Sequence, residues 1–351
     1  MSHIAKPGVR HPSLEKNALG LTRRDYEGAM STLCAGCGHD SITAAMIEAF
    51  HELDLEPHRV AKLSGIGCSG KTTAYFLANA HGFNGVHGRM PAIATGAAAA
   101  NRELVLIGIS GDGDSLSIGL GQLSHAIRRN VDMLYVIENN GVYGLTKGQF
   151  SASADIGSKS KKGEANRQRP IDPVFLALTL GAGFVARSFS GDKKQLVPLI
   201  KAAIEHRGAA FIDVISPCVA FNNHAGSTKS YDYVREHNEA VNRIDFIPRR
   251  REITVEGGEG EVLEVIQHDG SLLRLRKLHA LYDPTDRVAA MTYIQQRQAA
   301  GEVVTGLLYV DTNPEDLHAH LDTVETAFNQ LGTSDLCPGS AALEGINRSL
   351  R

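Results

Sequence analysis

The amino-acid sequence predicts an α/β protein built on a doubly wound, mainly parallel sheet. Short apolar runs of strand length alternate with longer segments whose apolar residues recur at helical spacing. Turns rich in Gly, Asn and Asp follow several of these runs, as is typical of the carboxyl ends of parallel strands. A chain of 351 residues with 42% hydrophobic and 21% charged residues is large enough to bury a sizeable core.

Charge and composition narrow the class of protein. The formal net charge of −3 gives no sign of a nucleic-acid partner. No apolar run approaches the roughly 18 residues that a membrane span needs, and residues 1–33 are too polar for a signal peptide. We therefore expect a cytoplasmic protein. Five cysteines in such a chain favour metal or redox chemistry over disulfides.

The first hundred residues predict an arm, two helices and a strand. Residues 1–30 show no lasting period and are expected to form an arm. Apolar residues over 42–53 recur at helical spacing, and Asp40 or Ser41 is expected to cap this helix. A short strand over 60–64 comes next, and a small-residue helix follows over 91–100.

The most informative part of the sequence holds two apolar runs, each followed by polar turn residues. The runs 104–109 and 133–137 predict two parallel strands joined by one helix that ends near Arg129. Asp112 follows the first strand and Asn140 follows the second. Both residues should therefore lie at the carboxyl edge of the sheet, where open α/β sheets bind ligands.

These turn residues suit a phosphate and a divalent cation. Gly111 and Gly113 let backbone amides approach a ligand closely, and the N-terminus of the next helix favours an anion. Asp112 and Asn140 offer a carboxylate and an amide oxygen, hard ligands for Mg²⁺, which completes its octahedron with phosphate oxygens and water. An ordinary strand–turn–helix unit with an acidic turn is the simpler alternative.

The alternation of elements continues to about residue 245. After a polar loop over 150–169 we expect helices over 172–180 and 193–207 and strands over 184–186 and 211–215. Beyond a helix near Tyr231 the pattern changes to hairpin strands, expected over 252–255, 262–267 and 272–276, then a helix over 285–300 and a strand over 303–310. We accordingly divide the chain into an arm (1–30), a cofactor-binding domain (31–245) and a C-terminal extension (246–351).

The GDG motif at 111–113, followed by the paired asparagines 139 and 140, resembles the thiamine diphosphate motif. Its continuation NNGVYGLTKGQ resembles the β subunit of the 2-oxoacid:ferredoxin oxidoreductases. The segments CxGCGH, GIGCSGK, HGR, GDGD and SPC occur in the order expected for that family, over roughly residues 30–245. The resemblance implies a doubly wound sheet of the thiamine diphosphate-binding type.

The resemblance also implies a role for each motif residue. Mg²⁺ would be held by the side chains of Asp112 and Asn140 and by the backbone carbonyl of Val142. Leu145 and Lys147 would recognise the 2-oxoacid, and we expect Lys71 to face the carboxylate end of that substrate. The residues expected to contact the cofactor are Ile66, Gly67, Cys68, Ser69, His87, Gly113, Asp114, Gly144 and Leu145.

Four cysteines fall in three predicted loops at the same edge of the sheet. A CxxC pair stands at a helix N-terminus, where thiolates are stabilised. Four thiolates suit a [4Fe-4S] cluster or a structural zinc ion, and the resemblance implies the cluster. Cys337 falls outside the pattern. The expected cluster ligands are Cys34, Cys37, Cys68 and Cys218.

One segment supports a different function. Residues Gly65–Thr72 read GIGCSGKT, which fits a P-loop with a strand before it and a helix after it. A P-loop NTPase would use Lys71 on nucleotide phosphates and Thr72 on Mg²⁺. This alternative leaves the GDG motif, the paired asparagines and the cysteines without a task, so we prefer the oxidoreductase.

The resemblance implies a β subunit that acts with 2-oxoglutarate, CoA and oxidised ferredoxin to give succinyl-CoA, CO₂ and reduced ferredoxin, reversibly. Pyruvate is the alternative substrate. Lys71 and Lys147 could serve the second carboxylate of 2-oxoglutarate. In this family a glutamate from a second α/β domain activates the cofactor, and residues 1–33 are too few to form one. We therefore expect an α subunit to complete the site in an (αβ)₂ assembly.

Overall fold

The computed structural model describes residues 11–159, 163–224, 227–240, 262–266, 272–276, 282–337 and 339–351. The strand expected over 252–255 and residues 1–10 of the expected arm lie outside this part of the chain. Within the described residues, no helix combines the length and the apolar character that crossing a membrane requires.

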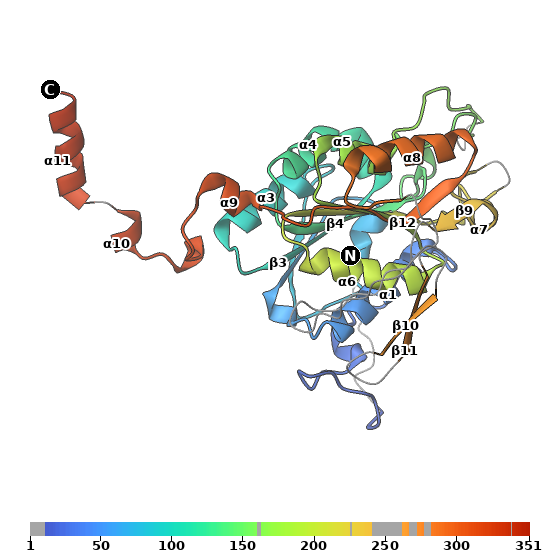
Figure 1. Cartoon of the computed structure of the whole chain (residues 1–351), viewed down its shortest axis with the longest axis horizontal. Coiled ribbons are helices and arrows are strands. Elements are labelled where there is room, and N and C mark those ends of the chain that lie inside the picture. The colour runs from blue at the N-terminus through green and yellow to red at the C-terminus, as the bar shows by residue number, and fades with distance from the viewer. Residues whose placement is uncertain are drawn as a thin grey trace.

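A mainly parallel sheet forms the centre of the molecule (Figure 1). Its eight strands, counted over the described residues, are arranged in the order β2-β1-β3-β4-β8-β7-β12-β9. All neighbours are parallel except β12 and β7. The predicted α/β class is confirmed. The strands are β1 (Val60–Ser64), β2 (His81–Asn84), β3 (Val105–Gly111), β4 (Met133–Asn139), β7 (Phe184–Phe189), β8 (Ala209–Ile215), β9 (Asn238–Ala240) and β12 (Val303–Val310).

Helices cover both faces of the sheet (Figure 1). Helices α1 (Gly38–Glu52) and α6 (Lys193–Glu205) pack on one face, where Leu134 and Val136 of β4 point. The other face carries α3 (Met90–Ala100), α4 (Leu120–Arg128), α5 (Pro173–Leu180) and α8 (Arg287–Ala299). Because both faces are buried, the central strands read as continuous apolar runs instead of alternating ones.

The C-terminal region is partly built into this core. Strand β12 pairs with β7 inside the sheet, and α8 packs against the same apolar cluster as α5. Beyond them, α9 (Leu317–Leu321) packs beside α3, and α10 (Thr333–Leu336) and α11 (Gly339–Ser349) lead away from the body (Figure 1). The expected hairpin is present as antiparallel strands β10 (Val262–Ile266) and β11 (Leu272–Arg276).

Two expectations about helix starts are wrong. Helix α1 begins at Gly38 with Cys37 as its N-cap residue, so Asp40 and Ser41 lie inside its first turn and do not cap it. The helix expected directly after the GDG motif is also divided. A π-helical turn over Gly113–Ile118 comes first, and α4 begins only after Gly119. Such π turns are frequent at functional sites.

The remaining elements are short and connect these layers. They are η1 (Arg23–Tyr26), η2 (Pro57–Arg59), α2 (Cys68–Thr72), β5 (Val142–Tyr143), β6 (Gln149–Phe150), α7 (Tyr231–His237) and η5 (Phe328–Gln330). Strands β5 and β6 pair with each other just beyond the carboxyl end of β4.

Candidate functional site

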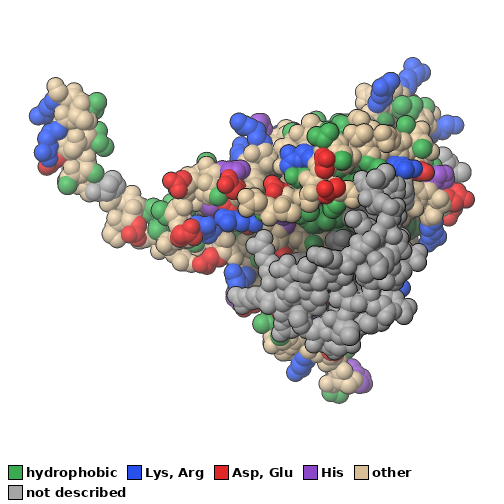
Figure 2. Space-filling model, viewed as in Figure 1, with side chains coloured by type: hydrophobic (Ala, Val, Ile, Leu, Met, Phe, Trp, Pro, Cys, Tyr) green, Lys and Arg blue, Asp and Glu red, His purple; other side chains and the backbone are tan. Residues whose placement is uncertain are grey.

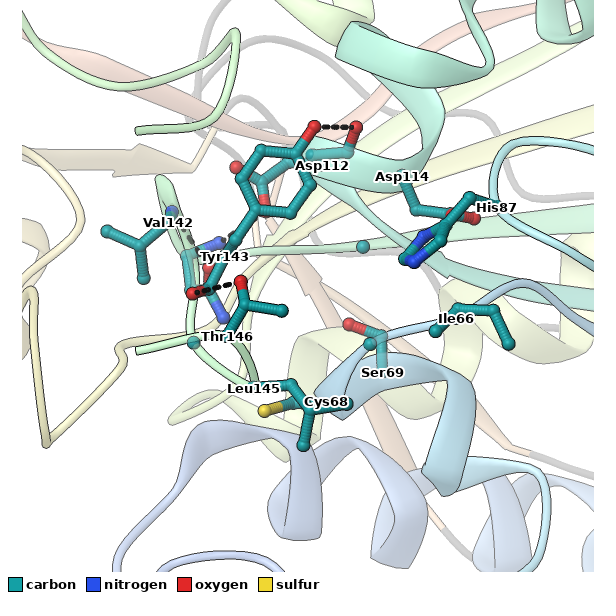
Figure 3. A pocket seen from close by; sticks show the side chains of 15 residues that line it. Ile66, Cys68, Ser69, His87, Asp112, Asp114, Val142, Tyr143, Leu145 and Thr146 are labelled. Atoms are coloured by element: carbon teal, nitrogen blue, oxygen red, sulfur yellow. Dashed lines mark hydrogen bonds and ion pairs between the residues drawn. The ribbon is translucent and has the colours of Figure 1, made fainter. Parts of the chain in front are cut away.

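The carboxyl ends of β1, β3 and β4 surround one cavity, which Figure 3 shows from close by. Every residue predicted above to contact Mg²⁺ or thiamine diphosphate lines it. These residues come from four separate segments of the chain, and the topology of the parallel sheet brings them together. Gly111, which the sequence analysis expects near the phosphate, also lines it, and two further lining residues, Tyr143 and Thr146, were not predicted. We call this space the cofactor cavity.

Asp112 is the most firmly held acidic group of the cavity. Its side chain is 1% exposed. Oδ2 accepts hydrogen bonds from the backbone N–H of Gly141 at 3.0 Å and from the hydroxyls of Ser153, at 2.6 Å, and Ser151. Four donors, including the more distant N–H of Asn140 at 3.4 Å, thus fix the orientation of the carboxylate. The two serines follow β6 and belong to no motif, so no sequence pattern pointed to them.

Asn140 and Val142 lie beside this carboxylate. The turn between them requires a left-handed residue, which Gly141 supplies with φ of 75°. Asn140 Oδ1 accepts the N–H of Val142 at 3.0 Å, and the backbone carbonyl of Asn140 accepts the side-chain amide of Asn222 at 2.8 Å. One carboxylate, one amide oxygen and one backbone carbonyl form a hard donor set that fits Mg²⁺.

Asp114 connects the cavity to the HGR segment. It is 3% exposed, and its Oδ1 accepts the N–H of Gly88 at 2.9 Å and lies 3.2 Å from Nδ1 of His87. Gly65 presses against this carboxylate, because a Cβ placed there would come within 1.8 Å of Asp114 Oδ2. Gly65 therefore leaves space that Asp114 needs.

The geometry of Gly65–Thr72 argues against a nucleotide-binding P-loop. Helix α2 is only five residues long. The hydroxyl of Thr72 is buried and donates to Oε2 of Glu138 at 2.9 Å, so it is engaged and not free to bind a metal ion. Lys71 donates to the backbone carbonyl of Thr32 at 3.1 Å.

The four predicted cluster cysteines line a second cavity of about 180 Å³, which we call the cysteine cavity. It shares Cys68, Asn140, Gly144 and Leu145 with the cofactor cavity. Burial raises the pKa of the Cys37 thiol to about 12, and it also raises those of Cys68 and Cys218. In the described part of the chain, no three Cys, His, Asp or Glu side chains are grouped closely enough to hold a single metal ion. Cys337 is exposed and lines neither cavity.

A buried pair that the sequence analysis missed lies between the cavities. His39 lines the cysteine cavity, and its Nε2 is 3.5 Å from the amide of Asn140. Its Nδ1 is 2.6 Å from Ser216 Oγ and 3.6 Å from Glu138 Oε2. Burial lowers the pKa of His39 to about 4 and raises that of Glu138 well above its usual value. His39 is therefore neutral near pH 7 and does not form an ion pair with Glu138. The position of His39, directly after the CxxCG motif, was the available signal.

The residues predicted to recognise the substrate are spread over the site. Leu145 lines both cavities and is half-exposed. Lys71 lines only the cysteine cavity. Lys147 is exposed, has a positive φ of 78° and lies in the turn closed by the bond from Gly148 N–H to the carbonyl of Tyr143. It borders neither cavity directly.

Comparison with known proteins agrees with this geometry. Residues 65–214 match the model of the thiamine pyrophosphate enzyme, C-terminal TPP binding domain. The chain is 45% identical over 216 residues to the 2-oxoacid:ferredoxin oxidoreductase subunit beta of Saccharolobus solfataricus, covering 61% of this chain and 68% of the relative. It is 38% identical over 258 residues to the 2-oxoglutarate oxidoreductase subunit KorB of Mycobacterium tuberculosis, covering 71% and 67%.

One solved structure is similar to this chain over most of the length of both. The 2-oxoglutarate:ferredoxin oxidoreductase from Magnetococcus marinus, with 2-oxoglutarate, coenzyme A and succinyl-CoA bound, aligns with a TM-score of 0.70 and 31% identity. The alignment covers 88% of this chain and 92% of that one.

Proposed function

Because the chain belongs to the β subunits of the 2-oxoacid:ferredoxin oxidoreductases, we propose that it forms the metal–diphosphate half of a thiamine diphosphate site and carries a [4Fe-4S] cluster. The chain contains a thiamine diphosphate-binding domain, and as a β subunit it acts with an α partner. The observation that carries the proposal is the single cavity shared by all the residues expected to contact Mg²⁺ and the cofactor.

Asp112, Asn140 and Val142 hold Mg²⁺ in this proposal. Support comes from their hard oxygen donors and from Ser151 and Ser153, which orient the carboxylate before the metal arrives. The remaining positions on Mg²⁺ would be left to the diphosphate and to water. His87 lies beside Asp114 and offers the exposed edge of its imidazole to the diphosphate. Preorganised ligands of this kind lower the cost of ordering the site on binding.

Cys34, Cys37, Cys68 and Cys218 ligate the [4Fe-4S] cluster. Four thiolates around a tetrahedral zinc ion would lie about 3.8 Å from one another, given Zn–S bonds of about 2.3 Å. All four cysteines line one cavity of about 180 Å³, which is wider than a single ion needs. A cluster is also favoured over zinc because the family is named for electron transfer to ferredoxin, and zinc has no redox chemistry.

Thiamine diphosphate, when bound, supplies the electron sink for decarboxylation of a 2-oxoacid, and the cluster supplies a one-electron path to ferredoxin. The chain contributes the common wall of the two cavities, formed by Cys68, Asn140, Gly144 and Leu145. Any side chain on Gly144 would lie between cofactor and cluster, because its Cβ would come within 3.5 Å of the sulfurs of Cys68 and Cys218. His39, whose pKa is lowered by burial, adds no positive charge beside this path.

The proposed substrate is 2-oxoglutarate, with CoA as acyl acceptor, in an (αβ)₂ complex. Several relatives are named for 2-oxoglutarate, and the similar solved complex was obtained with 2-oxoglutarate, coenzyme A and succinyl-CoA. Lys71, which lines the cysteine cavity, and Lys147, in the exposed turn after Thr146, offer positive charge for the distal carboxylate that pyruvate lacks.

The test is steady-state kinetics of the chain purified anaerobically with its α partner. We expect kcat/KM for 2-oxoglutarate to exceed that for pyruvate at least tenfold. Lys147→Met should raise KM for 2-oxoglutarate far more than KM for pyruvate. A preference for pyruvate would overturn the substrate assignment. An isolated β chain that turned over as fast as the complex would overturn the shared site.

A further inference from the structure

One short segment of the chain joins the two cavities of the site. Residues 218–222 begin with Cys218, which lines the cysteine cavity, and end with Asn222, whose side chain bonds to the backbone of Asn140. We call residues 218–222 the Cys218 turn. We call residues 140–142 the metal turn, since Asn140 and Val142 are expected to bind Mg²⁺. No motif of the sequence accounts for the Cys218 turn beyond Cys218 itself.

The Cys218 turn is closed by hydrogen bonds to the backbone carbonyl of Cys218. This carbonyl accepts the N–H of Phe221 at 3.2 Å and that of Asn222 at 2.8 Å. The backbone of Asn222 is thereby fixed to that of Cys218. A displacement of Cys218 would therefore also displace Asn222.

The side chain of Asn222 holds the metal turn from behind. It is 2% exposed, and its amide donates to the backbone carbonyl of Asn140 at 2.8 Å. This close approach requires glycine at position 141, because a Cβ on Gly141 would come within 2.6 Å of Asn222 Nδ2. The hydrogen bond thus fixes the peptide group that lies between Asn140 and Val142.

The Cys218 turn also contacts the loop that carries Leu145 and Lys147. A Cβ on Gly148 would come within 2.9 Å of the ring of Phe221, so the ring lies directly against this part of the loop. Two successive turns after β4 are therefore in contact with the same short segment.

Other connections between the cysteine cavity and the metal turn are weaker. His39 lines the cysteine cavity, but its Nε2 is 3.5 Å from the side-chain amide of Asn140, at the outer limit for a hydrogen bond. Cys68 lines both cavities, yet among the described residues no hydrogen bond joins residues 65–72 to the metal turn. The bond from Asn222 is the short link between a cluster cysteine and the metal turn.

We propose that Asn222 is a positioning residue that couples the two sites, so that Mg²⁺ and thiamine diphosphate bind tightly only when the cluster is present. This inference rests on the proposed function, which assigns the cluster to the cysteine cavity and Mg²⁺ to the metal turn. With the cluster bound, Cys218 is held in place, and Asn222 in turn holds the carbonyl of Asn140.

Loss of the cluster reverses this order. The side chain of Cys218 is then no longer held by iron, and the Cys218 turn gains conformational freedom. The metal turn must be ordered at the moment of binding, which lowers the affinity for Mg²⁺. A chain that has lost its cluster, and with it the electron path, would thus also lose its cofactor.

The size of the effect follows from comparable cases. Coupling between two sites typically changes affinity by five- to 150-fold. Removing an outer partner of a metal ligand typically costs ten- to 100-fold in metal affinity. We therefore expect removal of the cluster to raise the Mg²⁺ concentration for half-maximal thiamine diphosphate binding about tenfold.

The experiment uses the αβ complex purified anaerobically, with the cluster intact and after its removal by ferricyanide and a chelator, followed by gel filtration. Mg²⁺ is titrated at fixed thiamine diphosphate, and binding is measured by calorimetry, so no turnover is needed. Asn222→Leu keeps the size of the side chain and removes its donor. With the cluster intact this variant should need about tenfold more Mg²⁺ than the wild type, and cluster removal should change its requirement less than twofold.

A second variant and two controls separate the hydrogen bond from other causes. Asn222→Ala should behave as Asn222→Leu does, which rules out strain from the larger side chain. Ser153→Ala weakens metal binding through Asp112, so it should raise the Mg²⁺ requirement and yet keep the tenfold effect of cluster removal. Asn347→Ala changes an exposed residue of α11, which Figure 2 shows standing clear of the body, and should behave as the wild type.

Three results would count against the inference. An equal Mg²⁺ requirement with and without the cluster in the wild type would overturn it and leave the proposed function standing. A tenfold effect of cluster removal that persists in both Asn222 variants would also overturn it. So would a cluster-free Asn222→Leu complex that needs far more Mg²⁺ than the cluster-free wild type, a comparison that holds even if the variant assembles no cluster. A wild-type complex without iron or without thiamine diphosphate binding would overturn the proposed function, and the inference with it.

Discussion

The hydroxyl of Ser153 donates a hydrogen bond of 2.6 Å to the carboxylate of Asp112, although the two residues follow different strands of the fold. Asp112 follows β3 of the central sheet, and Ser153 comes after β6 of the small hairpin. The same hydroxyl lies 2.8 Å from Oδ1 of Asn139, whose amide donates to Asp213. The expected metal ligand is thereby tied to the buried Arg187–Asp213 pair beneath the sheet edge.

Replacing Ser153 by Ala should weaken metal binding. The change leaves Asp112 with fewer donors and a less fixed orientation, and losing such an outer partner typically costs tenfold or more in metal affinity. We expect the Mg²⁺ concentration for half-maximal thiamine diphosphate binding to rise about tenfold, as measured by fluorescence or calorimetric titration. Ser124→Ala, on the surface of α4, is the control. Equal Mg²⁺ requirements in both variants would count against the role of Ser153.

Gly65→Ala should abolish thiamine diphosphate binding, whereas Gly96→Ala should not. The new methyl group would overlap Asp114 and force the π-helical turn to shift. We expect thiamine diphosphate binding to fall below detection. Gly96, in the middle of α3, has open space around its Cα, so Gly96→Ala should stabilise the chain by up to about 1 kcal/mol and leave binding intact. Retained cofactor binding in Gly65→Ala would contradict the packing argument.

The cysteines provide a test with an internal control. Cys218→Ser removes one of the four thiolates proposed to ligate the cluster. The iron content should therefore drop well below four per chain, and the visible absorption should weaken. Cys337→Ser changes an exposed thiol outside both cavities and should leave iron content and absorption as in the wild type. Iron lost equally from both variants would mean that the four cysteines do not act as a set.

Asp132 gives a prediction about pH and stability. Burial raises the pKa of its carboxyl to about 6, against a usual value of 3.8. Above pH 6 the carboxylate is charged in both states and the folded state bears the cost of burying it. As the pH falls from 6 toward 4, the folded state takes up a proton before the unfolded state does, and this cost disappears.

Asp132→Asn should therefore raise the free energy of unfolding by about 1–2 kcal/mol at pH 7 and by little at pH 4. The amide oxygen can still accept the N–H of Gly208, so the fold keeps that hydrogen bond. Urea unfolding of the full-length chain at the two pH values is the measurement. An equal gain in the free energy of unfolding at both pH values would show that the charge of Asp132 is not the cause of the gain.

The sequence predicted the fold and the motif residues of the site because both depend on local patterns. Strands buried on two faces, such as β4, read as unbroken apolar runs, and parallel topology then brings Asp112 and Asn140 to one edge. The sequence could not predict contacts between distant segments. Ser153 reaches Asp112 from a loop without a motif, and His39 meets Glu138 only after α1 packs beside β4.

Sequence patterns also could not predict where strand β12 lies in the sheet. A run such as 303–310 indicates a strand but does not tell which neighbour it pairs with or in which direction. The structure places β12 between β7, to which it is antiparallel, and β9. The start of α1 shows a similar limit, since its N-cap residue is Cys37, whose side chain makes no capping hydrogen bond that a sequence pattern could reveal.

The most direct test of the account is the cofactor content of the protein. The chain should be purified anaerobically with any co-purifying partner, and iron, sulfide, zinc and thiamine diphosphate should be measured per chain together with a visible spectrum. We predict about four irons, about four sulfides and about one thiamine diphosphate in a brown protein. A colourless protein with bound zinc and no thiamine diphosphate would contradict the account.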